Sequence, residues 1–129
     1  MRKMLVYIIL ALLVIGLGIF AVSCTLNPLR KSEEDIRTAI LEITPIGMSI
    51  NDTLSAIENK GWISDGINHL RGVSSVEIQA LNETVGSKSI KANVGEYTIF
   101  FETRVLVWWA FDEDSKLLDV FVRKDIHGF

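Results

Sequence analysis

Hydrophobic and polar positions divide the chain into an apolar N-terminal block and a longer segment of mixed pattern. Leu5 to Val22 is a run of 18 residues without a charged side chain. From Ser32 onward, apolar residues recur first at helical spacing and later at the two-residue spacing of strands. The pattern predicts three regions: residues 1–23 as a lipoprotein signal peptide or an uncleaved anchor, residues 24–31 as a membrane tether, and residues 32–129 as a single domain.

Two amphipathic helices are predicted at the start of the domain. Apolar residues from Ile36 to Ile43 follow the i, i+4, i+7 spacing of one helical face, and Ser32 before three acidic residues is typical of a helix N-terminus. Pro45 ends this helix, because proline lacks the N–H that a helix needs. A second helix is predicted to begin at Ser49 and to end at Gly61.

The C-terminal part has the pattern of strands. Tyr97 to Phe101 is β-branched and aromatic, and Val105 to Phe111 is apolar on both faces, as in a central strand. Asp112 to Lys116 is a polar hairpin connection, and Leu118 to Arg123 alternates apolar and polar residues. The fold class is therefore predicted to be α+β, with two N-terminal helices packed on a three- or four-stranded antiparallel sheet.

The segment between the second helix and these strands has a weaker pattern. Residues 62–95 are rich in Ser, Asn and Gly. The alternation allows one strand, near Ser75 to Leu81.

Adjacent tryptophans on the predicted central strand point to opposite faces of the sheet. Trp109 has apolar neighbours two and four residues away, so it is predicted to lie in the core. Trp108 shares its face with Leu106, and an outward Trp on an apolar face is a candidate partner surface, together with Trp62. The alternative is that residues 62–95 cover Trp108.

Candidate catalytic chemistry is sparse. Neither His69 nor His127 stands at metal-ligand spacing from a cysteine or a second histidine. The chain has no Gly-rich phosphate loop and no nucleophile elbow, and Asp112 to Asp114 lacks the glycine and the closing glutamate of a calcium loop. We therefore expect no catalytic residue, no metal, no cofactor and no small-molecule substrate.

The single cysteine stands where the apolar block ends. Arg2 and Lys3 precede the block, and Cys24 follows it directly after a serine. A basic start and an apolar run are the parts of an export signal, while 18 residues also reach the lower range for a spanning helix. Without residues 1–23, the chain has 11 basic and 16 acidic residues, a net charge of −5, which disfavours nucleic acid as a partner.

Ala21-Val22-Ser23-Cys24 resembles the bacterial lipobox. The resemblance implies that signal peptidase II cleaves before Cys24 and that the Cys24 thiol carries a diacylglycerol. Thr25, as a residue other than Asp after the cysteine, implies transfer to the outer membrane. The protein would then be lipid-anchored and face the periplasm; the alternative is a single-span protein of the inner membrane.

Two further stretches carry a resemblance to a family. Ile46 to Leu54 resembles the Gly-Met-Thr/Ser helix start of the small outer-membrane lipoproteins called BamE, SmpA or OmlA. Phe111 to Leu118 is similar to the hairpin of that family, with Ser115 in place of the usual glycine. The resemblance implies an ααβββ plan, which domains like the β-lactamase inhibitor protein share.

These expectations together indicate a non-catalytic lipoprotein of the bacterial envelope that binds an envelope protein or supports assembly. An inhibitor or immunity-type binding protein on the same fold is the alternative, as is a single-span membrane protein.

Overall fold

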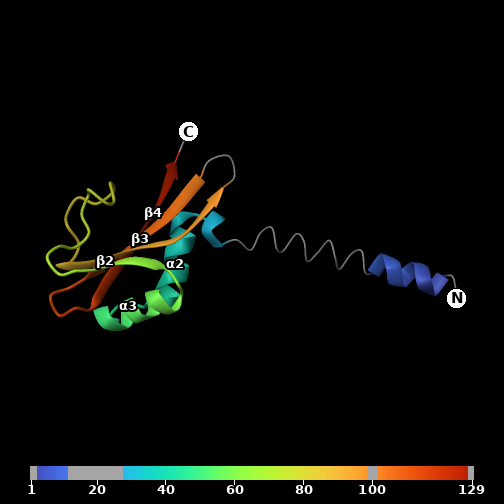
Figure 1. The fold of residues 1–129 in the computed structure, drawn as a ribbon, viewed down its shortest axis with the longest axis horizontal. Helices are drawn as coiled ribbons and strands as arrows, with labels where there is room; N and C mark the ends of the chain where they lie inside the picture. The colour runs from blue at the N-terminus through green and yellow to red at the C-terminus, as the bar shows by residue number, and fades with distance from the viewer. Residues whose placement is uncertain (1–2, 12–27, 99–101, 128–129) are drawn as a thin grey trace.

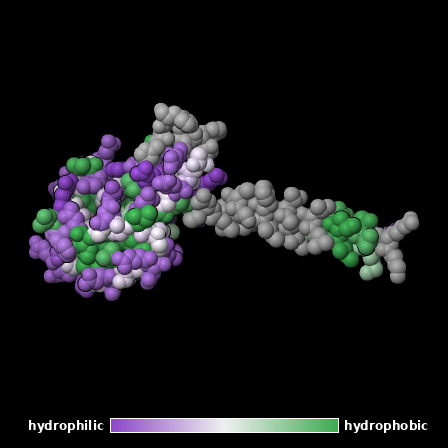
Figure 2. All heavy atoms as spheres, in the orientation of Figure 1, coloured by the Kyte–Doolittle hydropathy of each residue, from purple (hydrophilic) through white to green (hydrophobic). Residues whose placement is uncertain are grey.

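A computed structural model of the chain describes residues 3–11, 28–98 and 102–127 (Figure 1). Residues 3–11 are helical and exposed, and Figure 2 shows that this short helix is hydrophobic. In the described ranges, no helix is both long enough and apolar enough to span a membrane. Cys24 and most of the apolar block lie outside the described residues.

Beyond the helix of residues 3–11, two α-helices of the described part precede the sheet, as the sequence predicts. Helix α2 (Glu33–Ile43) begins after Ser32, whose hydroxyl accepts a hydrogen bond from a first-turn N–H at 3.1 Å. Helix α3 (Ile50–Asn59) begins in the same way after Ser49, at 3.2 Å. Both predicted caps are confirmed, because each serine satisfies an N–H that has no partner within the helix.

Four antiparallel strands form one sheet in the order β1-β2-β3-β4. The strands are β1 (Ile63–Asn68), β2 (Lys88–Thr98), β3 (Glu102–Phe111) and β4 (Leu117–His127). The α+β class is therefore confirmed, with the helices before the strands (Figure 1). The predicted central strand is β3, and the predicted polar connection is the β3–β4 hairpin.

The pleat of β3 separates two cores. Trp109 is fully buried on the helix side of the sheet, as predicted, and Trp108 belongs to a smaller cluster on the opposite side. The helix-side core also contains Ile36, Ile40, Ile50, Ile57, Ile90, Val105, Val107, Phe111 and Val120. These two clusters are the reason that β3 is apolar on both faces.

Residues 69–87, which we call the cover segment, lie on the sheet face opposite the helices. Their partly buried and buried apolar residues are Val73, Ile78, Leu81 and Val85, and these pack against Leu106, Trp108 and Ala110. An isolated antiparallel bridge between Val73 and Val85 closes the segment, with N–H to O=C distances of 2.9 and 2.7 Å. The second core is therefore built by a segment without a regular strand.

The strand predicted near Ser75 to Leu81 is wrong. These residues form turns, because the N–H and the hydroxyl of Ser74 both donate to the Glu77 carboxylate, at 3.0 and 2.7 Å. A serine followed three residues later by glutamate is a capping box, which starts a helical turn. The N–H of Ile78 continues that turn by donating to the Ser74 carbonyl at 3.0 Å.

β1 and most of β2 lie in residues 62–95, where the sequence pattern predicts a strand only near Ser75 to Leu81. β1 is short and its register shifts between Ser64 and Ile67, which interrupts the alternation. β2 begins at Lys88, and the predicted strand of residues 97–101 supplies only its last two residues, while residues 99–101 lie outside the described part.

The end of the predicted tether belongs to the folded domain. A short 3-10 helix, η1 (Pro28–Arg30), places Leu29 against the helix-side core. A Cβ on Gly95 would lie 2.7 Å from Leu29 Cδ1, so the glycine permits this close approach. Lys124 Nζ also donates a hydrogen bond to the Lys31 carbonyl. Residues 28–31 are thus docked on β2 and β4.

Candidate functional site

The three residues predicted to form a partner surface do not share one surface. Leu106 and Trp108 are only 6% and 4% exposed, because the cover segment packs over them. The prediction of an exposed Trp108 is therefore wrong, and the alternative of a covered Trp108 is confirmed. Trp62 lies on the helix side, where its ring centroid is 6.2 Å from that of Trp109.

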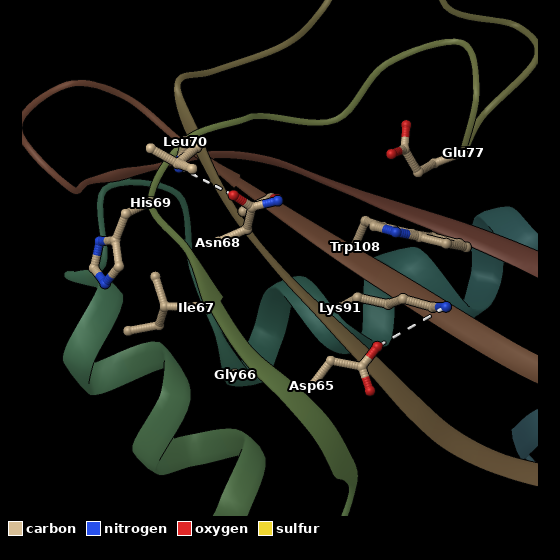
Figure 3. Close-up of a pocket in the computed structure, with 10 residues that line it drawn as sticks. Asp65, Gly66, Ile67, Asn68, His69, Leu70, Glu77, Lys91 and Trp108 are labelled. Atoms are coloured by element: carbon tan, nitrogen blue, oxygen red, sulfur yellow. Dashed lines mark hydrogen bonds and ion pairs between the residues drawn. The ribbon is translucent and has the colours of Figure 1, made fainter.

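A groove of about 560 Å³ lies beside the cover segment, on the same face of the sheet. We call it the outer-face groove. Its principal lining residues are Asp65, Asn68, Leu70, Glu77, Lys91 and Trp108 (Figure 3). β1, β2 and β3 supply the floor, and the cover segment supplies Glu77 and Leu70.

Two cations contact the face of Trp108. Lys91 is the cross-strand partner of Trp108, and its Nζ lies 5.6 Å from the ring centroid. The Arg123 guanidinium lies 4.7 Å from the same centroid. Arg123 also forms two hydrogen bonds with the Asp125 carboxylate, at 2.8 and 3.0 Å, and donates to the Glu77 carbonyl at 2.6 Å. The hydrogen bond from Arg123 to the Glu77 carbonyl attaches the cover segment to β4, while Asp125 and the Trp108 ring hold the guanidinium in place.

Glu77 is held in its charged form. Partial burial raises the pKa of its carboxyl, but hydrogen bonds from the Ser74 hydroxyl and N–H, with the charge of Arg71, lower it more, so the net pKa is below its ordinary value. Arg71 Nη2 lies 3.2 Å from Glu77 Oε1. The Glu77 carboxylate therefore stabilises the turn at Ser74 and binds Arg71 within the cover segment.

Lys91 and Asp65 are the charged groups with most exposure in the groove. Their Nζ and Oδ2 atoms are 3.9 Å apart, and the side chains are 42% and 70% exposed (Figure 3). An exposed pair at this distance contributes little to folding stability. Both groups are thus available for contact with a ligand or partner.

The remaining polar residues of the groove form local hydrogen bonds. Asn68 Oδ1 accepts from the Leu70 N–H at 3.0 Å, and Ser89 Oγ donates to the Arg71 carbonyl at 2.9 Å. His69 is exposed and lines the groove, whereas His127 ends β4. Among the residues that the structure describes, no group of three or more His, Cys, Asp or Glu side chains could hold a metal ion.

The acidic stretch of residues 112–114 forms the tip of the β3–β4 hairpin. Asp112 Oδ1 accepts a hydrogen bond from the Lys116 N–H at 2.9 Å, and its carbonyl accepts from the Ser115 N–H at 3.0 Å. Ser115 has a φ of 62°, the left-handed region in which glycine is usual. The hairpin glycine of the resembled family would suit this position for that reason.

The outer edge of the sheet at β1 is irregular, which disfavours the addition of another strand. The register shift in β1 bends the strand, and the Gly66 N–H is already bonded to the Ser64 hydroxyl at 2.9 Å. Bulges and charged residues are common protections of edge strands. A partner at this end of the sheet would therefore contact side chains of the outer-face groove.

At the other edge, α2 contacts β4 and occupies one of its carbonyl groups. Arg37 Nε donates to the Val120 carbonyl at 2.9 Å, and Arg37 Nη2 donates to Asp119 Oδ1 at 2.5 Å. The hydrogen bond with Asp119 raises the pKa of the Arg37 guanidinium above its ordinary value, against the effect of burial. Arg37 thus stays charged and joins the helix to the strand edge.

The chain matches no protein-family model, no curated protein and no solved structure.

Proposed function

We propose that the chain is a non-catalytic lipoprotein of the bacterial envelope whose domain binds a protein partner. The observation that carries the proposal is the position of the only cysteine in the sequence, Cys24, which is separated from the apolar block by Ser23 alone and follows small or aliphatic residues. Two or three acyl chains at this residue would give stable anchoring, whereas one chain binds a membrane only marginally. Thr25 favours the outer membrane, with the domain in the periplasm.

The outer-face groove is the proposed partner site. Two large apolar side chains beside it are strongly exposed: Leu70 at 95% and Ile63 at 72%. Ile63 lines an adjoining hollow that shares Asp65 and Lys91 with the groove. Exposed apolar residues next to an accessible charged pair, on a rigid sheet, suit an interface with an apolar centre and a polar rim.

Support for envelope assembly as the specific role comes from the resemblance to the BamE, SmpA or OmlA lipoproteins. The resembling stretches are Ile46 to Leu54, which leads into α3, and Phe111 to Leu118, which forms the β3–β4 hairpin. An inhibitor or immunity-type binding protein is the second candidate, because the same layout of helices on a sheet serves such proteins. A single-span protein of the inner membrane is the alternative to the lipid anchor.

Metabolic labelling with an alkyne fatty acid, combined with intact mass measurement, tests the anchor. The wild-type chain should lose residues 1–23 and carry the label, and Cys24→Ser should carry none. An unlabelled wild-type protein with an intact N-terminus would show a single-span anchor instead.

A photo-crosslinking amino acid at Leu70 tests the partner site. Ile126 is the matched control position, because it is also exposed and lies near the end of β4, where it does not line the groove. Crosslinks to a barrel-assembly protein at Leu70 alone would support the first role, and crosslinks to a hydrolase or toxin would support the second. Equal crosslinking at both positions would contradict the groove as the partner site.

A further inference from the structure

A second groove, apolar and about 370 Å³ in volume, lies on the helix side of the sheet. We call it the helix-side groove. Ile36 and Ile40 of α2 form its buried floor, and Leu29, Trp62 and Val94 form partly buried walls. Its volume is within the range of about 300–1,000 Å³ that is usual for small-molecule sites, which are mainly apolar with a few polar groups.

The walls of this groove are fixed by contacts that do not depend on a ligand. The Leu29 side chain packs closely against Gly95. The hydrogen bond from Lys124 to the Lys31 carbonyl fixes the backbone that follows Leu29. Trp62 follows α3 directly and stacks at a tilt of 31° on Trp109. The groove is therefore largely preformed, which reduces the entropy that a ligand must lose on binding.

The rim of the groove carries more positive than negative charge. Lys31 and Lys60 contribute two ammonium groups, and Asp35 contributes one carboxylate; all three residues are exposed. A long lysine side chain places its charge at the water-exposed rim while its aliphatic part extends the apolar wall. An apolar floor below a cationic rim is complementary to an amphiphile with an apolar tail and an anionic head.

The groove also lies close in sequence to the apolar block. Val22 ends the block, and Leu29 already forms a wall of the groove. Seven residues span at most about 25 Å when fully extended. If the block or its lipid-modified end is in a membrane, as the proposed function requires, the groove is within reach of lipids at that membrane surface.

We propose that the helix-side groove binds the chain of a long-chain fatty acid from the membrane, with the carboxylate between Lys31 and Lys60. This inference rests on the proposed membrane attachment. A single chain is favoured because the volume is near the lower end of the usual range. The bound fatty acid would hold the domain with one defined face toward the bilayer.

Quenching of Trp62 fluorescence tests the proposal with the full chain in nanodiscs of neutral phosphatidylcholine. A brominated stearic acid is the probe, and Trp62→Phe identifies the Trp62 signal. We expect saturable quenching in the wild type. Ala39→Phe fills the groove from an exposed position on α2 and should weaken the apparent affinity about tenfold. Thr38→Phe is the matched control, since residue 38 is exposed on the same helix but does not line the groove.

Lys31→Gln/Lys60→Gln should lower the affinity for the brominated acid and leave any quenching by brominated phosphatidylcholine unchanged. Quenching that is equal in the wild type and in Ala39→Phe would overturn the proposal, because it would report only proximity to the bilayer. Absence of quenching would overturn it as well. Co-elution of the chain with the nanodiscs is measured separately, so a failed anchor is distinguished from an unoccupied groove.

Discussion

The indole N–H of Trp109 donates a hydrogen bond to the hydroxyl of Thr44 across 3.0 Å, and both side chains are fully buried. The Thr44 hydroxyl in turn donates to the Ile40 carbonyl at 2.9 Å. This pair connects the C-terminal end of α2 to the C-terminal part of β3. It also satisfies the one polar group that the buried indole brings into the helix-side core.

Replacement of the Thr44 hydroxyl should therefore destabilise the domain. Thr44→Val has nearly the same shape but leaves the Trp109 N–H without an acceptor, which costs about 1–3 kcal/mol. Thr44→Ser keeps the hydroxyl and loses one methyl group, at about 1 kcal/mol or less. Urea unfolding of the detergent-solubilised chain, followed by tryptophan fluorescence, gives both values. Equal stability of the valine variant and the wild type would contradict a role for this hydrogen bond.

Closure of the cover segment should depend on Gly72. A Cβ at this position would lie 2.1 Å from the Val85 carbonyl oxygen, which is part of the backbone bridge that closes the segment. Gly72→Ala should open the bridge at a cost of about 1–3 kcal/mol and expose Trp108 to water. Acrylamide quenching of fluorescence measures the exposure. Ser75→Ala, at an exposed position in the same segment, is the control and should leave quenching unchanged.

The attachment of the cover segment should weaken in acid. The pKa of Glu77 is lower in the folded protein than its ordinary value of 4.5, so unfolding of this part takes up a proton. The stabilisation of the cover segment by the charged Glu77 carboxylate is present above about pH 4.5. It is lost as the pH falls through the lowered pKa of this group in the folded state. The hydrogen-exchange protection factors of residues 69–87, which are corrected for the intrinsic pH dependence of amide exchange, should fall over that range in the wild type.

Glu77→Gln should remove most of this pH dependence, because the amide does not titrate. Glu83→Gln changes an exposed carboxylate in the same segment and is the matched control. The same acid response in the wild type and in Glu77→Gln would assign the effect to other groups.

Docking of η1 should require the absence of a side chain at residue 95. Gly95 has a φ of 142°, and an added Cβ would meet Leu29 Cδ1 at 2.7 Å, so Gly95→Ala should destabilise the domain by about 1 kcal/mol or more. Leu29→Ala removes the atom that the new methyl group meets. A double-mutant cycle should therefore give a loss smaller than the sum of the two single losses. Additive losses would show that the two positions are not coupled.

The helices and the last two strands were predictable because their signals are local. Ser32 and Ser49 cap the helices through hydrogen bonds within one turn. The apolar residues from Val105 to Phe111 identify β3 without information from any other segment. β2 carried a usable signal as well, since Ile90 and Ala92 alternate with Lys91 and Asn93. The capping box of Ser74 and Glu77 was likewise visible in the sequence and argues against a strand there.

The apolar block with Cys24 at its end, the α+β class and the burial of Trp109 all follow from the order of residues, because each depends on neighbouring residues or on a short period. The burial of Trp108 and the position of Trp62 on the other side of the sheet depend instead on how distant segments pack. The same packing decides which residues line the two grooves. The physical reason is that the environment of a sheet face is set by segments far away in the chain, here residues 28–31 and 69–87, and their packing leaves no periodic signal in the sequence.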